Sequence, residues 1–202
     1  MNGDEVRAVA DALRSGKLAI LPTDTVYGLC CSPYRPEPSE HMYRLKGRGP
    51  QQPTTLLAAD VEALFELVPE LRGRSGMIAR ALLPGPYTLV LPNPARRYRW
   101  LAGSTPEAIG VRVPELPDES AAVVARVGGV AATSANLRGG PDPRRLEDVP
   151  DELRSQAVAV DGGELPGRPS TVLDFTGAEP RIVREGAAPG HDALERAVAA
   201  LA

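Results

Sequence analysis

The sequence predicts an α/β fold in one domain that covers residues 1–202, and three observations support this prediction. Short apolar runs of strand length recur along the chain, and segments with the helical spacing of apolar residues lie between them. The 21 prolines and 20 glycines fall between these segments, as turn residues do. A chain of 202 residues with 43% hydrophobic residues can also bury one large core.

The first elements of the chain are a helix and two strands. Apolar residues at 6, 9, 10 and 13 follow the i, i+3, i+4, i+7 spacing of an amphipathic helix. The apolar run Leu18–Leu21 then predicts a strand that is buried on both faces of a covered sheet. Pro22 donates no backbone N–H, so we expect the strand ladder to end there before a second strand at 29–31.

The segment between these strands, Thr23-Asp24-Thr25, is polar. Ligands of α/β sheets bind beyond strand ends, so two hydroxyls and a carboxylate at this place could bind an amine, a hydroxyl or hydrated magnesium. The alternative is that Thr and Asp side chains satisfy only the backbone of their own turn.

A basic segment follows the second strand. A short helix capped by Ser39 is expected to deliver Lys46 and Arg48. Lys17 and Lys46 are the only lysines among 23 basic residues, so Lys46 stands where the composition favours arginine. A compact ammonium and a forked guanidinium together suit a polyphosphate, whereas the alternative is a solvated basic turn.

The later patterns predict the remaining elements in order. They are a strand at 54–57, a helix at 61–68 capped by Asp60, a helix from Ser75 through Leu82, a strand ending at Leu91, a strand around Arg112, a helix at 121–127, a strand at 130–133, a surface excursion with a short helix at 141–156, strands at 157–160 and 170–175, and a closing helix at 193–201.

Two arginine-containing segments have open interpretations. Arg112 lies inside an otherwise apolar strand, so it must be paired, either with a carboxylate ligand such as a free amino acid or with an Asp or Glu of the chain. The stretch 96–100, Arg-Arg-Tyr-Arg-Trp, could stack a nucleobase or follow an RNA backbone, and it could equally be a hairpin tip with solvated arginines.

Several function classes are excluded or disfavoured. The net charge of −3 argues against a protein that coats nucleic acid by bulk charge. Neither a P-loop nor a G-x-G-x-x-G motif is present, and His41 and His191 lie beside no plausible nucleophile, so we expect no triad hydrolase and no metal site. Adjacent Cys30 and Cys31 suit reduced core thiols. No apolar run reaches membrane-span length and the N-terminus is not a secretory signal, so we expect a cytoplasmic protein without membrane contact.

Separated motifs, taken in order, resemble those of the YrdC/Sua5 family of threonylcarbamoyl-AMP synthases. They are P-T-D-T-V-Y-G-L at 22–29, K-G-R at 46–48 before Pro53, L-P-G-P-Y-T at 83–88, G-V-R-V-P at 110–114, S-A-N at 134–136, P-S-T-V-L-D at 169–174 and R-I-V-R-E-G at 181–186.

The resemblance implies a twisted mixed sheet with flanking helices around a concave, positively charged cleft. It implies that L-threonine, bicarbonate and ATP with Mg²⁺ give threonylcarbamoyl-AMP and pyrophosphate, for threonylcarbamoyladenosine in tRNA. It also implies the short bacterial form, without the C-terminal Sua5 extension, which hands its product to a tRNA threonylcarbamoyl transferase complex.

The resemblance also assigns site residues. Those implied for ATP are Lys46, Arg48, Gln52, Ser134, Asn136 and Arg184, with Lys46 and Arg48 as the catalytic pair. Those implied for L-threonine are Thr23, Thr25, Arg112, Ala132 and Ser170.

The chain departs from the family pattern at a few positions. Gln52 stands where many relatives have Asn or Lys, and Leu57 stands where Sua5-type members have a histidine. Leu57 offers no hydrogen bond to an amino acid. Two alternatives are a YciO-like protein that binds tRNA or double-stranded RNA without synthase activity, and a carbamoyl-transfer domain of the kind found in hydrogenase maturation proteins.

Overall fold

The computed structural model describes residues 3–49 and 51–201; Pro50, in the spacer after Arg48, lies outside them. The elements are α1 (Gly3–Arg14), β1 (Leu18–Pro22), β2 (Tyr27–Cys31), α2 (Pro36–Leu45), β3 (Thr55–Leu57), α3 (Val61–Leu67), α4 (Arg74–Leu82), β4 (Tyr87–Pro92), β5 (Ala108–Arg112), α5 (Asp118–Val127), β6 (Val130–Ser134), α6 (Asp151–Arg154), β7 (Ala157–Ala159), β8 (Thr171–Asp174), β9 (Arg181–Arg184) and α7 (Gly190–Ala199), with 3₁₀ turns at Arg99–Leu101 and Leu146–Asp148.

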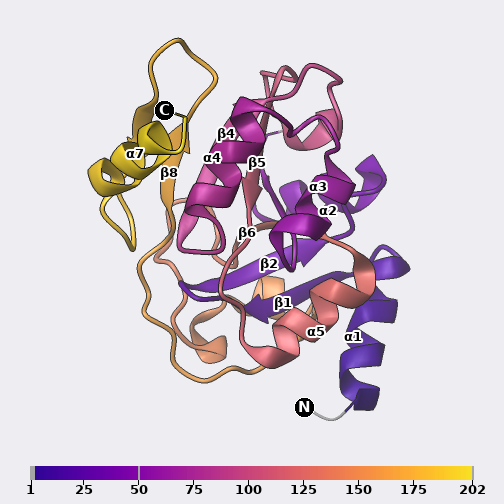
Figure 1. The fold of residues 1–202 in the computed structure, drawn as a ribbon. Helices are drawn as coiled ribbons and strands as arrows, with labels where there is room; N and C mark the ends of the chain where they lie inside the picture. Colours follow the sequence, from indigo (N-terminus) through magenta and orange to yellow (C-terminus); the bar gives the residue numbers. More distant parts are fainter. Residues whose placement is uncertain (1–2, 50, 202) are drawn as a thin grey trace.

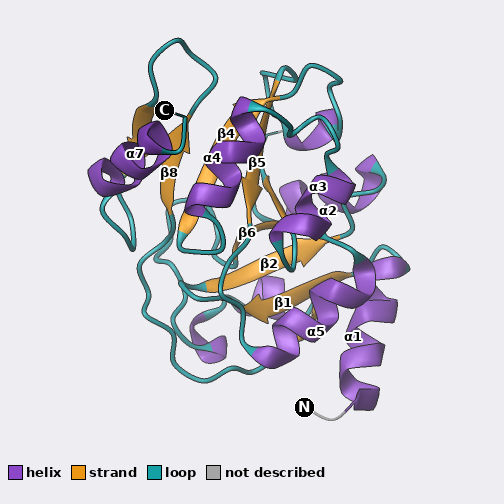
Figure 2. Ribbon diagram, in the orientation of Figure 1, coloured by secondary structure: helices purple, strands orange, loops and turns teal. Residues whose placement is uncertain are grey.

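All described strands belong to one mixed sheet in the order β7-β1-β2-β6-β3-β5-β4-β8-β9. The pairs β1–β7, β3–β5 and β4–β8 are parallel, and the other neighbouring pairs are antiparallel. The sheet is strongly twisted, because β1 and β2 run across the direction of β4, β5 and β8 (Figure 1; Figure 2). The predicted single α/β domain with a twisted mixed sheet is therefore confirmed.

At the β1–β2 end, helices cover both faces of the sheet. Side chains alternate along a strand, so Leu18 and Ile20 belong to one buried cluster, and Ala19 and Leu21 belong to the other. The first cluster includes buried residues of α2, α3, α4 and α7. The second includes residues of α1 and α5, which pack beside each other in Figure 1. The prediction that the strand at 18–21 is buried on both faces is confirmed.

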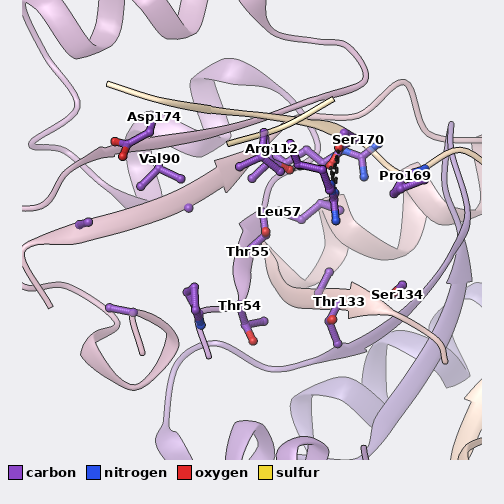
Figure 3. Close-up of a pocket in the computed structure, with 18 of the residues that line it drawn as sticks. Thr54, Thr55, Leu57, Val90, Arg112, Thr133, Ser134, Pro169, Ser170 and Asp174 are labelled. Atoms are coloured by element: carbon purple, nitrogen blue, oxygen red, sulfur yellow. Dashed lines mark hydrogen bonds between the residues drawn. The ribbon is translucent and has the colours of Figure 1, made fainter. Parts of the chain in front are cut away.

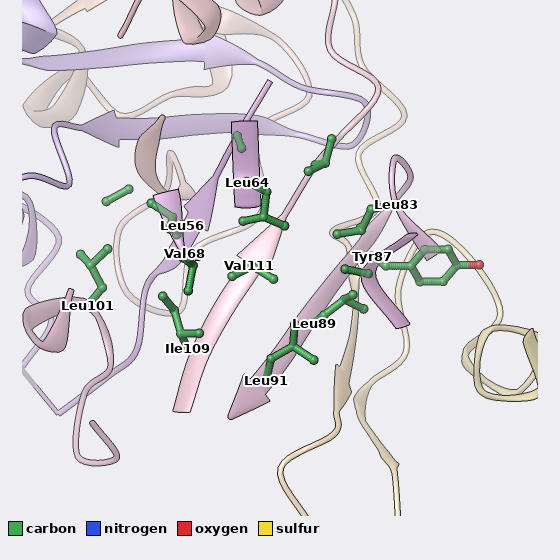
Figure 4. Packing of buried hydrophobic residues seen from close by; sticks show 14 of the residues in the cluster. Leu56, Leu64, Val68, Leu83, Tyr87, Leu89, Leu91, Leu101, Ile109 and Val111 are labelled. Atoms are coloured by element: carbon green, nitrogen blue, oxygen red, sulfur yellow. The ribbon is translucent and has the colours of Figure 1, made fainter. Parts of the chain in front are cut away.

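On the β3-β5-β4-β8 part of the sheet, one face carries the core and the other face is open. Leu89 and Leu91 of β4 pack with Ile109 and Val111 of β5 in the large cluster (Figure 4). The intervening residues of β5 are Ala108, Gly110 and Arg112, which line a cavity on the opposite face. The period of two therefore separates core from cavity along the same strand.

Two predicted helix starts are wrong. The helix expected to begin at Ser39 begins at Pro36, whose fixed φ suits a first turn, and Ser39 is buried inside it. The helix expected to begin at Ser75 begins at Arg74, directly after Gly73. By contrast, Asp60 caps α3 as predicted, because its Oδ1 accepts a hydrogen bond of 2.7 Å from the Ala63 amide.

The stretch 96–100 is anchored to the body of the protein. Arg96 and Arg97 pair with Glu107 and Glu70 at 2.6 Å. The indole N–H of Trp100 donates to the Pro33 carbonyl at 3.1 Å. These contacts fit a hairpin tip with solvated arginines better than an open surface on which a nucleobase could stack. Within the two described ranges, no helix has the length and apolar character that a membrane span needs.

Candidate functional site

The open face of the sheet forms a cavity of about 490 Å³. It is bordered by the turn between β1 and β2, by β2, and by residues of β6 and β9, and it is floored by β3, β5, β4 and β8; Figure 3 shows Thr55, Leu57, Val90 and Arg112 of this floor. Four arginines and one aspartate line it, so its charge is locally positive although the chain is acidic overall; they are Arg48, Arg112, Arg181, Arg184 and Asp174.

Arg112, the last residue of β5, is held by the polar turn after β1. Its Nη2 donates to Asp24 Oδ1 and, at 3.0 Å, to Thr25 Oγ1. Burial raises the pKa of Asp24 and lowers the pKa of Arg112, and the opposite charge of each partner counters both shifts. Arg112 therefore pairs with an aspartate of the chain, which is one of its two predicted partners, and the same side chain also lines the cavity.

The two threonines of this turn have different surroundings. Thr23 lines the cavity. Its hydroxyl donates a hydrogen bond of 2.7 Å to the Val26 carbonyl and accepts one of 3.2 Å from the Thr25 amide. Thr25 is fully buried, and it is not among the described residues that line the cavity. The turn therefore satisfies part of its own backbone and presents Thr23 to the cavity.

Ser170 lies beside Arg112 in Figure 3, just before β8. Its hydroxyl lies 2.8 Å from that of Thr88 on β4. Arg184, the last residue of β9, donates through Nη2 to the Ser170 carbonyl at 2.8 Å and to its hydroxyl at 3.3 Å. The three side chains form a connected polar group on the cavity wall.

Arg48 enters the cavity from the chain after α2. Its Nε donates to Gln52 Oε1 at 2.8 Å, its Nη1 to Thr133 Oγ1 at 2.8 Å and its Nη2 to the Pro53 carbonyl at 3.1 Å. Burial lowers its pKa, although a guanidinium stays charged throughout the physiological range. Gln52 orients this arginine and is itself outside the cavity lining that the structure describes.

Lys46 lies behind the cavity wall. It is 3% exposed, and its Nζ donates to the carbonyls of Ser134 and Asn136 and, at 3.1 Å, to Asn136 Oδ1. Burial, followed by the charge of Arg48, lowers its pKa to about 8, and Asp142 opposes the shift. Ser134 lines the cavity, whereas Lys46 and Asn136 are not among the described lining residues.

The far end of the cavity holds a charged group that sequence reasoning left without a role. Asp174 accepts from Arg181 Nε at 2.9 Å and Nη2 at 2.7 Å, and from the Thr176 amide at 2.9 Å. Burial alone would raise the pKa of Asp174, but the hydrogen bonds from Thr176 and Arg181 outweigh it and lower the pKa. Asp174 and Arg181 belong to two of the family motifs, at 169–174 and 181–186, so the sequence could have indicated that they lie at the site.

The structure brings part of the predicted set together in one cavity. Seven predicted residues line it: Thr23, Arg48, Arg112, Ala132, Ser134, Ser170 and Arg184. Four others support the wall from behind or from the side: Thr25, Lys46, Gln52 and Asn136. Leu57 also lines the cavity and gives it an apolar floor patch. The ligand roles of these residues stay predictions.

The described residues contain no group of three or more His, Cys, Asp or Glu side chains that could hold a metal ion. Asp174, the carboxylate on the cavity wall, already accepts hydrogen bonds on both oxygens.

Comparison with known proteins identifies the family. The family model Sua5_yciO_yrdC, described as "Telomere recombination", matches residues 11–186. A Methylococcus capsulatus protein named threonylcarbamoyl-AMP synthase is 35% identical over 178 residues, which cover 86% of this chain and 94% of that protein.

Solved structures agree in fold. Pyrococcus abyssi Sua5 in complex with L-threonine superposes on 95% of this chain with a TM-score of 0.85 and is 31% identical to it in sequence. E. coli YciO superposes with a TM-score of 0.81 and is 26% identical, and the match covers 93% of this chain and 92% of YciO. This chain spans only 56% of the length of that Sua5 chain. A P. abyssi protein named threonylcarbamoyl-AMP synthase is 32% identical to this chain, and the match covers 92% of this chain but only 55% of that protein. The matched model covers most of the chain, and the protein therefore belongs to the Sua5/YciO/YrdC family.

Proposed function

We propose that this protein is an L-threonylcarbamoyladenylate synthase, which makes threonylcarbamoyl-AMP, pyrophosphate and water from L-threonine, bicarbonate and ATP. The observation that carries the proposal is one cavity lined both by the buried Arg112 with its neighbouring hydroxyls and by Arg48 and Ser134. Relatives that bear the synthase name, including one that the chain matches over 94% of its length, support the same reaction.

The threonine end of the cavity is assigned to Arg112, Thr23 and Ser170. A carboxylate of the substrate would accept from Arg112, which has donors beyond the one that serves Asp24 and Thr25. The hydroxyls of Thr23 and Ser170 suit the amino and hydroxyl groups of threonine. Ala132 is small enough to leave room for the substrate beside them.

The nucleotide is assigned to Arg48 and Ser134, and to Arg184, which also donates to Ser170 where the threonine and nucleotide parts of the cavity meet. Two guanidinium groups offset the charge of the triphosphate. The Ser134 hydroxyl donates its proton to Asn136 Oδ1, so it can accept a hydrogen bond from a ribose hydroxyl. Mg²⁺ would enter as the ATP complex, held by phosphate oxygens and water.

The chain promotes the reaction by positioning and charge stabilisation. The threonine amine forms a carbamate with bicarbonate, which releases water. A carbamate oxygen then attacks the α-phosphorus of ATP, and the bond to the β-phosphate breaks so that pyrophosphate leaves. Arg48 and Arg184 stabilise the charge that develops on the phosphates, and no covalent enzyme intermediate is needed.

The proposal is tested by pyrophosphate release from ATP with and without L-threonine and bicarbonate. We expect release to depend on both, and Arg112→Met to raise the KM for threonine about 10- to 100-fold, because a charged hydrogen bond is lost. The control is Arg96→Met, which removes an exposed arginine paired with Glu107 and should leave the KM for threonine unchanged.

The opposite outcome is equally informative. Folded protein that binds tRNA or double-stranded RNA but releases no threonine-dependent pyrophosphate would reject the synthase and support the YciO-like alternative. Binding of tRNA and delivery of the product to a tRNA threonylcarbamoyl transferase complex stay predictions of the family resemblance. A place in the cytoplasm stays a prediction from the apolar pattern and the N-terminal residues of the sequence.

A further inference from the structure

We infer that Lys46 does not touch the nucleotide and instead positions the turn 134–140, so that the two basic residues of K-G-R have different tasks. This inference rests on the proposed function, since it concerns the nucleotide end of the same site. Arg48 is the residue that contacts ATP, and Lys46 is a positioning residue.

The ammonium group of Lys46 has no donor left for a phosphate. It carries three N–H groups, and it has three acceptors: the carbonyls of Ser134 and Asn136 and the Asn136 side-chain oxygen. The side chain is 3% exposed and is not among the described residues that line the cavity. A phosphate contact would require Lys46 to release this turn.

Arg48 differs in both respects. It lines the cavity, and among the described residues three of the five N–H groups of its guanidinium are used, by Gln52, Thr133 and Pro53. Two N–H groups therefore remain for a ligand. The same partners fix the direction of the guanidinium, so that the remaining donors are held in place before a ligand arrives.

The turn that Lys46 holds connects directly to the cavity. Asn136 Oδ1 accepts from Lys46 and, at 2.7 Å, from the Ser134 hydroxyl, while Asn136 Nδ2 donates to the Gly140 carbonyl at 2.7 Å. Ser134 is the member of this network that lines the cavity. Loss of the ammonium would leave two partly buried carbonyls without this donor and would free the Ser134 hydroxyl to move.

The protonation state of Lys46 adds an independent readout. Burial and the neighbouring charge of Arg48 lower its pKa to about 8, and Asp142 is the facing group that opposes the shift. A neutral amine has two N–H groups, so one of the three oxygens would then face a lone pair. The turn should therefore loosen, and ATP affinity should fall, as the pH rises through about 8.

The test compares Lys46→Met and Lys46→Arg with Arg44→Met, a matched control that removes an exposed positive charge two residues away on α2. Two quantities are measured: ATP affinity by calorimetry, and hydrogen exchange of the ligand-free protein. The amides of Ala135 and Gly140 report on the turn, because they donate to the backbone carbonyls of Tyr27 at 2.8 Å and of Leu137 at 3.0 Å, respectively.

We expect both Lys46 variants to speed exchange at these two amides and to weaken ATP binding about 10- to 100-fold, with no change in the control. Arginine should not restore binding, because a planar guanidinium cannot direct donors at three convergent oxygens. Weakened ATP binding with unchanged exchange, or full affinity in Lys46→Arg, would show a direct phosphate contact and overturn the inference. Faster exchange with unchanged affinity would overturn it too.

The wild-type protein supplies a measurement that needs no variant. Its ATP affinity should fall as the pH rises through about 8, and a flat profile would contradict the inference. Exchange and ATP binding need no turnover, so these results stand apart from the test of the proposed function. That function fails if pyrophosphate release does not depend on threonine and bicarbonate.

Discussion

The ion pair between Arg112 and Asp24 includes two buried atoms, Asp24 Oδ2 and Arg112 Nε, that have no hydrogen-bond partner among the described residues. Such atoms carry a cost, since an unsatisfied buried polar atom loses its hydration without compensation. A buried guanidinium beside a cavity is a poor choice for stability alone. Its position suits a ligand that supplies a second carboxylate.

Replacing Asp24 tests how strongly this pair is held. Asp24→Asn removes the counter-charge of a buried arginine, so the free energy of unfolding should fall by about 3–5 kcal/mol in urea denaturation. Asp11→Asn is the matched control: it removes the partner of Arg14 in an ion pair whose side chains are 60% and 53% exposed, and it should cost less than about 1 kcal/mol. Equal small losses in both variants would contradict the role of Asp24 as a buried counter-ion.

The two cysteines should be unreactive in the folded protein. Both are free and fully buried, and burial raises the pKa of Cys31 to about 12 and that of Cys30 still further. We expect a thiol reagent at neutral pH to label neither residue until the protein unfolds. Rapid labelling of native protein would show that the packing around β2 opens.

The same thiols predict a loss of stability in alkali. Their folded-state pKa values lie above the unfolded value of 9.0, so the folded state keeps protons that the unfolded chain loses. Stability should therefore fall as the pH rises from 9.0 towards 12. Denaturation midpoints of wild type and a Cys30→Ala, Cys31→Ala variant should keep a constant offset on the acid side of this window, and within it the wild-type midpoint should fall more steeply with pH; curves that stay parallel throughout would contradict the shift.

At the scale of elements, the loop before β8 is tied to β2 by one hydroxyl. Tyr27 OH donates to the Gly163 carbonyl at 2.8 Å and accepts from the Gly162 amide at 2.9 Å. This loop leads to Ser170 on the cavity wall. The Tyr27 hydroxyl therefore links the first hairpin to the segment that carries a predicted threonine contact.

Tyr27→Phe should lower the free energy of unfolding by about 1–3 kcal/mol, because it leaves loop backbone groups without a partner. Hydrogen exchange at the Gly162 amide should rise in the same variant. Tyr34→Phe is the control, since its hydroxyl also donates to a carbonyl, that of Val127 at 2.8 Å, but the residue is 52% exposed and water can replace it. A cost in Tyr27→Phe no larger than in Tyr34→Phe would remove the link.

Local sequence patterns predicted elements better than their ends. The apolar spacing at 6–13 and the Asp60 cap were sufficient for α1 and α3, because those signals are local. The starts of α2 and α4 were placed too late, because Pro36 and Gly73 determined where the helices begin and the serines only lay nearby. Near Arg112, alternation with Ile109 and Val111 was visible, but not which face would stay open.

At the scale of the whole molecule, the site arises where a covered sheet becomes uncovered on one face. Helices α1 and α5 cover that face over β1 and β2, and the cavity follows over β3, β5, β4 and β8. Strand order could not be predicted, since pairs such as β1–β7 join residues far apart in the chain. For the same reason the Lys46 contacts, 88 and 90 residues away, were not visible in the motif.

The motif resemblance did place most of the candidate site. Several motifs supplied a residue at a strand end, among them Arg112, Ser134 and Arg184, and the twisted sheet brings those ends to one cavity. The polar group at Asp174 was missed as a site feature, because its motif signal carries no chemistry until Thr176 and Arg181 are seen around it.

The product formed from L-threonine, ¹³C-labelled bicarbonate and MgATP distinguishes synthesis from simple nucleotide binding. If the cavity holds threonine and ATP together, mass spectrometry of a quenched reaction will find threonylcarbamoyl-AMP that carries the label, with an equal amount of pyrophosphate. AMP and pyrophosphate without a labelled threonine adduct, or intact ATP with folded protein, would contradict the synthase proposal.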